Sequence, residues 1–290
     1  MMPPGTITGA TSHTPPSDHT PTPPTFTTPP HPPPPTTGYT HPPLPPLLPT
    51  DIRILSHNIN TLHTTSPAEL GATFDMYQDL DPTILCLQEC NKNWSQYDKT
   101  EGPLRDTVNR RWPGAKVTTA HCKKTNVFHD PYQPGGVAQM ILRKLTGRVS
   151  SHGRDELGRY TWQEVLLNGA RKLIIITAYR VTQEHLASCG HETAMQQWRK
   201  LRARGIETPN PRQQVLDDLT NFMSPLATDG HEILLLLDAN SPADDPAVEA
   251  FLDANNLHDL MSDYLPDTPP STYQRGRSKI DHAWGTIGIL

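Results

Sequence analysis

The sequence lacks the short motifs that mark many nucleotide-binding and nucleophile enzymes. It has no glycine-rich phosphate loop and no G-x-S-x-G turn, which excludes a P-loop nucleotide site and the serine nucleophile that such a turn presents. It has four cysteines but no paired C-x-x-C framework. Cys86 and Cys90 lie in or beside an apolar run, so reduced core thiols are favoured over a disulfide scaffold or a zinc site.

Hydrophobic runs long enough to cross a membrane and a strongly basic net charge are also missing. No stretch reaches the length of a membrane span, and no apolar segment near the start has the pattern of a signal peptide. We therefore expect an intracellular protein, nuclear or cytoplasmic, without membrane contact. The net charge of −5 means that any nucleic-acid contact must come from local basic patches. Nothing in the sequence indicates the oligomeric state.

Residues 1–50 differ in composition from the rest of the chain. More than half of the 32 prolines fall there, among many threonines, with Asp18 as the single charged side chain. Such a segment cannot bury enough apolar surface to form a core, so we predict a disordered Thr/Pro-rich tail. Residues 51–290 are then expected to form one α/β domain.

Two continuous apolar runs decide the fold class. Leu173 to Tyr179 and Glu232 to Asn240 are apolar on both faces, which predicts central strands covered by helices. Shorter strands are expected at residues 52–58, 83–89, 116–120, 137–142 and 160–167. Ser66-Pro67, Asn210-Pro211 and Asp245-Pro246 each place a capping residue before proline, as helix starts do. Strands and helices thus alternate along most of the domain.

A further helix is expected from Thr193 to Gly205. It carries the most basic short patch in the chain, Lys200, Arg202 and Arg204. This patch is interpreted as a solvated helix face or, alternatively, as a contact for phosphates.

Polar side chains stand where the expected strands stop. Asn58 ends the first strand, Gln88-Glu89 the second and Tyr179-Arg180 a later one, and the most apolar strand ends in Asp238-Ala-Asn240. Each can be an ordinary turn residue. Side chains at the carboxyl ends of neighbouring strands nevertheless share one rim of a sheet, where α/β proteins place their sites. Together these residue types suit one hard cation and one phosphate.

Several short pieces follow one another in a specific order along the chain: Asn58, Gln88-Glu89, Gly135-Gly136-Val137, Tyr179, Asp238-x-Asn240 and Ser278-Lys-Ile-Asp281-His282. In type and order they resemble the endonuclease/exonuclease/phosphatase superfamily. That superfamily includes deoxyribonuclease I, abasic-site endonucleases and the endonuclease domains of non-LTR (LINE-type) retrotransposons. The S-K-I-D-H motif, with Thr272 ahead of it, is most similar to the retrotransposon branch. The resemblance spans residues 52 to about 285.

The resemblance implies a two-sheet α/β sandwich and a Mg²⁺-assisted attack of water on a phosphodiester, with Mn²⁺ as an alternative ion. Glu89 and Asn58 would hold the metal. Asp238 would orient and deprotonate the water, while Asn240 and Tyr179 would donate hydrogen bonds to the phosphate. Thr272, Ser278 and Arg180 would contact the substrate. DNA is the implied partner.

The neighbouring Asp281 and His282 raise a specific question, because the superfamily uses a histidine in a later Asp-His pair. Ser278 to Asp281 matches the upstream strand instead, so the resemblance implies that Asp281 orients that histidine. Successive strand residues point to opposite faces, so Asp281 and His282 are not expected to aim at one centre. We therefore expect a sandwich whose last strand or strands are missing and a chain that ends before its catalytic histidine. His57, His63 and His185 are possible replacements for that histidine. His57 neighbours Asn58 and is expected to face away, whereas His63 lies in a loop that could swing in.

The leading hypothesis is a Mg²⁺-dependent DNA endonuclease of retrotransposon type whose activity is reduced or lost. One alternative is a superfamily phosphatase or phosphodiesterase that acts on lipid or inositol phosphates. Another is a non-catalytic remnant of such an element.

Overall fold

A computed structural model gives the structure of the chain. It describes Leu48 and Thr272 together with residues 51–63, 66–97, 102–122, 132–182, 192–262 and 279–289. All of these belong to one compact unit, Pro45–Leu290. The predicted tail up to residue 47, and also Cys189 and Ser278, lie outside the described residues.

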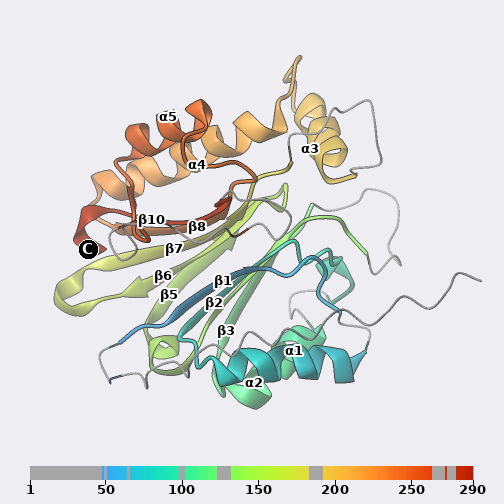
Figure 1. Cartoon of the computed structure of the whole chain (residues 1–290), viewed down its shortest axis with the longest axis vertical. Coiled ribbons are helices and arrows are strands. Elements are labelled where there is room, and N and C mark those ends of the chain that lie inside the picture. Colours follow the sequence, from blue (N-terminus) through green and yellow to red (C-terminus); the bar gives the residue numbers. More distant parts are fainter. Residues whose placement is uncertain are drawn as a thin grey trace, which may run out of the picture. The chain divides into compact units, whose positions relative to one another are not determined.

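Two β-sheets form the centre of this unit (Figure 1). The first has the strand order β1-β2-β4-β3 and the second the order β5-β6-β7-β8-β10-β9. The pairs β1–β2 and β7–β8 are parallel, and the other pairs are antiparallel. The strands are β1 (Ile54–Asn58), β2 (Ile84–Gln88), β3 (Lys116–Ala120), β4 (Val137–Ile141), β5 (Val149–Arg154), β6 (Tyr160–Leu166), β7 (Lys172–Tyr179), β8 (Glu232–Asp238), β9 (His258–Asp259) and β10 (Asp281–Gly285).

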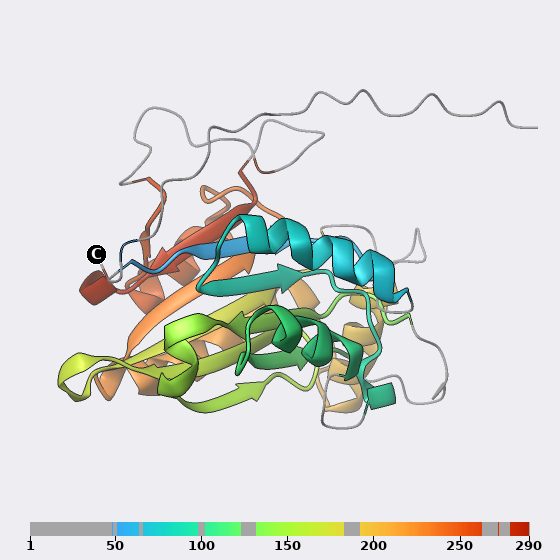
Figure 2. The same ribbon diagram turned by 90° about the horizontal axis from the view of Figure 1, so that it is seen from below.

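Helices cover the outer face of each sheet. In Figures 1 and 2, α1 and α2 lie against the first sheet, and in Figure 1 α4 and α5 lie against the second. The α-helices are α1 (Pro67–Asp79), α2 (Gly102–Arg111), α3 (Glu192–Ala203), α4 (Pro211–Thr228) and α5 (Pro246–Asn255), and short 3₁₀ turns span Trp94–Tyr97, Arg143–Arg148, Asn168–Ala170 and Ile287–Ile289. None of the described helices is long and apolar enough to cross a membrane.

Strand alternation explains why the two central strands are apolar throughout. In β8, Ile233, Leu235 and Leu237 pack against α4 and α5. The alternate residues Leu234 and Leu236 join the core between the two sheets. Each face is therefore buried against a different layer, as the unbroken apolar run predicts.

The predicted fold class is confirmed: the structure is a two-sheet α/β sandwich with helices outside. The three expected helix caps also form, because Ser66, Asn210 and Asp245 accept hydrogen bonds from the backbone N–H of Glu69, Gln213 and Ala247. The prediction missed α2 and β5, and it extended β8 to Asn240, whereas the strand ends at Asp238.

Candidate active site

Three candidate residues lie side by side at one end of the six-stranded sheet. Asp238 at the end of β8 is the register partner of Tyr179 at the end of β7. It is also the register partner of Asp281 at the start of β10. Register partners on neighbouring strands point to the same face of a sheet. Since Leu236 of β8 faces the first sheet, Asp238 two residues later faces it too, together with Tyr179 and Asp281.

The first sheet supplies two further candidates. Asn58, at the end of β1, donates from Nδ2 to Asp238 Oδ2 at 2.7 Å, which joins the two sheets directly. Glu89, which follows β2, accepts a hydrogen bond from the Tyr179 hydroxyl. The structure therefore brings together Asn58, Glu89, Tyr179, Asp238 and Asp281, five of the residues that the sequence singled out.

The Gly135-Gly136 turn holds the segment that carries Glu89. The N–H groups of Cys90 and Asn91 donate to the carbonyls of Gly136 and Gly135 at 3.1 and 2.8 Å. Gly136 has φ +81°, and a Cβ there would lie 2.8 Å from the carbonyl oxygen of Ala120. Glycine is required by both the backbone angle and the close approach. The sequence placed this pair among the pieces that resemble the superfamily but did not show its part in placing Glu89.

Asn240 lies just beyond β8 in a left-handed conformation, with φ +46°. Its N–H donates to Asp238 Oδ1 at 3.1 Å, and its Nδ2 donates to the carbonyl of Arg180 at 2.7 Å. Asparagine tolerates this backbone region better than most residues. The turn thus fixes Asn240 against the end of β7.

The carboxylates of the site carry more negative charge than their surroundings balance. Burial, followed by the nearby Asp281 carboxylate, raises the pKa of Asp238 to about 8, against the opposing hydrogen bonds from Asn58 and Asn240. Burial also raises the pKa of Asp281. The pKa of Tyr179 is well above its ordinary value because the hydroxyl is buried and faces the Glu89 carboxylate. A cation in this site would relieve the repulsion.

The donor set suits a hard divalent cation. Glu89 offers carboxylate oxygens and Asn58 an amide oxygen, the ligand types that Mg²⁺ accepts alongside water and phosphate oxygens. Among the described residues, no group of three or more His, Cys, Asp or Glu side chains could hold a metal by itself. A metal here would therefore depend on few protein ligands, as Mg²⁺ commonly does.

Asp281 and His282 lie on opposite faces of β10. Asp281 borders a cavity of about 680 Å³ between the sheets, lined mainly by apolar residues such as Ile54, Leu236 and Leu260. The His282 ring instead stacks on Trp284, with centroids 4.6 Å apart, and its Nε2 lies 3.0 Å from the carbonyl oxygen of Ser241. His57 likewise turns away, since its Nδ1 lies 2.6 Å from the Tyr77 hydroxyl of α1.

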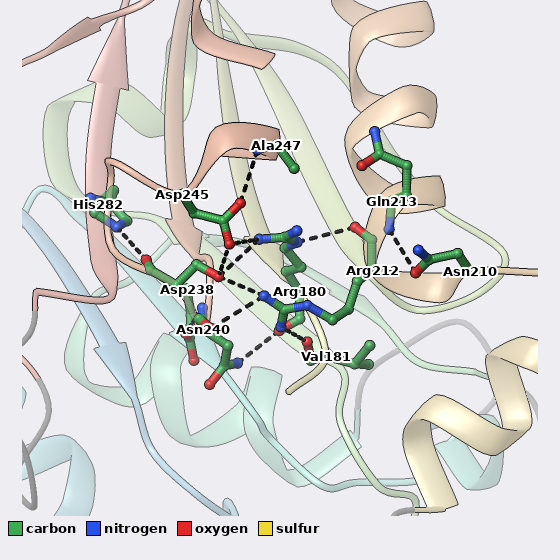
Figure 3. Close-up of polar contacts among 11 residues, drawn as sticks. Arg180, Val181, Asn210, Arg212, Gln213, Asp238, Asn240, Asp245, Ala247 and His282 are labelled. Atoms are coloured by element: carbon green, nitrogen blue, oxygen red, sulfur yellow. Dashed lines mark hydrogen bonds and ion pairs between the residues drawn. The ribbon is translucent and has the colours of Figure 1, made fainter. Parts of the chain in front are cut away.

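Of the three residues suggested as substrate contacts, two are described. Thr272 Oγ1 accepts from the N–H groups of Ile280 and Asp281 at 2.9 and 3.0 Å, so it braces the start of β10. Arg180 is 3% exposed, and its guanidinium is directed at Ser241 and Asp245 (Figure 3). Ser278 lies outside the described residues.

The sequence reading missed Arg212, the second residue of α4. Its guanidinium donates to the carbonyls of Val181 and Asn240 and to Ser241 Oγ, the last at 2.6 Å (Figure 3). It thereby ties together the segments that follow β7 and β8. Burial lowers the pKa of Arg212, and the nearby Asp245, Tyr179 and Asp238 oppose that shift. The Asn210-Pro211 cap was the only sequence signal, and it marks a helix start without indicating a site.

The same arrangement of sheets occurs in solved structures. AP endonuclease LMAP from Leishmania major is 13% identical, with a TM-score of 0.59 over 81% of this chain and 79% of that one. The catalytic domain of Xenopus laevis APE2 is 15% identical, with a TM-score of 0.52 over 81% and 82%. The human Nocturnin catalytic domain with bound sulfate is 18% identical, with a TM-score of 0.51 over 81% and 83%. At these identities the likeness concerns the fold.

No curated protein matches the sequence. The family model of the endonuclease/exonuclease/phosphatase family matches residues 55–288. This range contains both sheets, apart from Ile54 at the start of β1, and every residue of the candidate site. The members of that family are hydrolases, nucleases and phosphatases among them, that generally use divalent metal ions. The chain belongs to the endonuclease/exonuclease/phosphatase family.

Proposed function

We propose that the chain is a Mg²⁺-dependent phosphodiesterase that nicks DNA, of the type found in non-LTR retrotransposons. The observation that carries this proposal is the direct contact between the sheets at Asn58 and Asp238, 2.7 Å apart. Around that contact stand a buried tyrosine hydroxyl and two further carboxylates, Glu89 and Asp281. Groups of this kind can bind a phosphate, a cation and a water molecule together.

Asp238 is the proposed general base. A base works best when its pKa lies near the operating pH, and the pKa of Asp238 is raised to about 8. The hydrogen bonds from Asn58 and the Asn240 amide fix both of its oxygens. A water molecule oriented by Asp238 would lose its proton to this carboxylate as it attacks phosphorus.

Tyr179 and Asn240 are the proposed phosphate donors. Burial keeps the Tyr179 hydroxyl protonated, since its pKa is well above the ordinary value, so it can donate a hydrogen bond at neutral pH. The Asn240 side chain is held beside Asp238 by its αL turn. Preorganised donors stabilise the charge that develops on the phosphoryl oxygens.

Glu89 and Asn58 are the proposed metal ligands. Mg²⁺ held there would neutralise charge on the phosphate and on the departing oxygen as a Lewis acid. Glu89 already faces the Tyr179 hydroxyl, so the ligand and the phosphate donor share one edge of the site. Mn²⁺ would be accepted by the same oxygen donors.

DNA is the proposed substrate, and one of the similar structures, AP endonuclease LMAP, supports a nuclease by its name. The retrotransposon assignment rests on the resemblance of residues 278–282. Two alternative functions remain for the experiment to distinguish. One is a phosphatase or phosphodiesterase that acts on lipid or inositol phosphates, and the other is a non-catalytic remnant.

The test is nicking of supercoiled plasmid with Mg²⁺, run beside EDTA. We expect Mg²⁺-dependent nicking that falls by a factor of about 10² or more in Asp238→Asn. The matched control is Asp229→Asn, the same substitution at an exposed acid that follows α4, which should nick at the parent rate. Nicking that survives in Asp238→Asn contradicts the assigned base. Folded protein that leaves DNA intact but releases phosphate from inositol phosphates favours the first rival, and inactivity on both favours the remnant.

A further inference from the structure

Helix α3 is anchored at the rim of the site. Ala194 packs against an apolar cluster that contains Tyr179 and Val181, and Thr193 contacts Gly135. Gly135 is the residue whose carbonyl accepts the N–H of Asn91, two residues after Glu89. The start of α3 is therefore fixed to the same turns that present Tyr179 and Glu89.

One face of α3 is buried and the opposite face is basic. Gln197 and Leu201 are almost completely buried, and with Ala194 they follow the helical spacing of one face. Arg199 and Arg202 are exposed on the other side. In Figure 1, α3 lies at the opposite end of the sheets from the C-terminal residues, and it contacts α4.

An aromatic ring accompanies these charges. The Arg202 guanidinium lies over the Trp198 ring, 5.8 Å from its centroid. Lys200 lies on the other flank of the helix, close enough to Cys122 to lower its pKa, which burial raises. We call Trp198, Arg199 and Arg202 the α3 basic face.

One acidic residue of this region, Glu156, has its partner outside this face. Glu156 pairs with Arg204, beyond the end of the helix, and Arg202 also donates to the backbone carbonyl of Glu207. Two exposed guanidinium groups, one of which lies over an indole ring, form a surface that suits sugar-phosphate backbone and unstacked bases. The chain as a whole carries a net charge of −5, so attraction of a polyanion must come from local patches such as this one.

The spacing also suits a strand that continues from the site. Arg202 lies eight residues after Ala194, which is roughly 12 Å along a helix that rises about 1.5 Å per residue. Phosphates along one strand of B-DNA are spaced about 3.4 Å apart along the axis, so this length covers about three or four of them.

We propose that the α3 basic face binds the sugar-phosphate backbone of DNA a few nucleotides from the phosphate held at Asp238. This inference rests on the proposed nuclease function and names the surface by which that function would hold its substrate. Anionic lipid is the competing polyanion. In this proposal the α3 basic face contacts DNA at a place separate from the catalytic groups.

The test measures DNA binding without catalysis. Fluorescence anisotropy of a labelled duplex in EDTA gives the dissociation constant at several salt concentrations. In the double variant Arg199→Gln/Arg202→Gln we expect about tenfold weaker binding and a salt slope reduced by about two, since each phosphate contact contributes about 0.9 to the slope. The matched control, Arg148→Gln/Arg171→Gln, removes two exposed arginines that lie before β5 and β7 and should leave affinity and slope unchanged.

Equal weakening in the two double variants, or no weakening in either, overturns the inference. Tight binding to anionic phospholipid vesicles with no affinity for DNA overturns it as well. A Trp198→Phe variant adds an optical readout: DNA should quench part of the parent fluorescence, and this quenching should be lost in the variant if Trp198 contacts the DNA.

Hydrolysis of a small diester, bis(p-nitrophenyl) phosphate, separates this inference from the proposed function. The α3 variants should hydrolyse it at the parent rate because it is too small to reach the helix. DNA binding that depends on Arg199 and Arg202, without hydrolysis of any substrate, would keep the inference and refute the proposed activity. Hydrolysis of the diester without DNA binding would support the proposed activity and refute the inference about α3.

Discussion

The Asp238 carboxyl group is buried beside the Asp281 carboxylate, and both conditions disfavour its ionised form. Burial and the charge of Asp281 raise its pKa from 3.8 to about 8. The folded state therefore holds this proton more tightly than the unfolded chain does. The resulting contribution to stability is complete below about pH 4 and is lost as the pH rises through 8. The ionised site is thus an internal source of instability in the metal-free protein.

Asp238→Asn should accordingly stabilise the metal-free protein at high pH. The amide removes the buried charge but loses one of two accepted hydrogen bonds, at a cost of about 1 kcal/mol. We expect a net gain on the order of 2 kcal/mol in the free energy of unfolding at pH 9, shrinking as the pH falls towards 4. Urea unfolding in EDTA at several pH values measures this. A difference that stays constant with pH would contradict the raised pKa.

Arg212 holds the two strand ends together rather than contacting a strand itself. Its bonds to Val181, Asn240 and Ser241 fix the turn that carries Asn240. Arg212→Gln should lower kcat for plasmid nicking by about tenfold or more while KM changes little, because the phosphate donors are displaced but the α3 basic face remains. Steady-state kinetics of both constants measures this split.

Arg212→Lys is the matched variant, since it keeps the charge but not the planar fork of donors. If the planar arrangement of the Arg212 donors is needed, kcat should fall in the lysine variant too. Full activity in Arg212→Lys would assign the effect to charge alone. A rise in KM with unchanged kcat would contradict the positioning role.

The helices differ in how their prolines are used. Pro246 is at the start of α5, where the missing N–H has no helical partner. Pro225 lies inside α4, where it removes a backbone hydrogen bond. Pro225→Ala should raise the free energy of unfolding by about 1–2 kcal/mol, the helical gain less the extra entropy of the unfolded chain. Pro246→Ala is the control and should change stability little or lower it, so a gain in both variants would contradict the argument.

The strands most visible in the sequence are those buried on both faces. β7 and β8 are apolar at almost every position because each face packs on a separate layer. The apolar runs located both strands, although the prediction carried β8 two residues too far. β5 has the sequence VSSHGR, and its residues are alternately half-buried and exposed. As an edge strand with mainly polar side chains it gives no apolar signal, so the sequence could not reveal it.

Part of the site could be predicted because its residues stand at the ends of these apolar strands. Side chains at the ends of strands share a rim whenever the strands are neighbours, which brings Tyr179 and Asp238 together. Arg212 could not be predicted, because its role depends on where α4 begins in space and not on a pattern in the chain. The role of Gly135-Gly136 was also hidden, since the partner turn at Cys90 and Asn91 is remote in sequence.

At the scale of the whole molecule, the site depends on both sheets at once. Asn58 and Glu89 come from the first sheet, and the other groups come from the second. Buried glutamines also join the sheets: Gln163 donates to Thr118 Oγ1, and Gln139 donates to the carbonyl of Ile175. A small shift of one sheet against the other would therefore separate the proposed metal ligands from the proposed base.

The boundary of the domain gives the last prediction. The composition of residues 1–50 predicts a segment without a core of its own, and the compact unit begins at Pro45. Removing residues 1–44 should leave the thermal midpoint within about 2 °C of the full chain, because a segment of this composition is not expected to add to the core. Calorimetry of the two chains tests this, with DNA affinity in EDTA as a second readout. A large fall in the midpoint would mean that the tail packs on the domain, and an unchanged midpoint with weaker DNA binding would make it a second contact for the substrate.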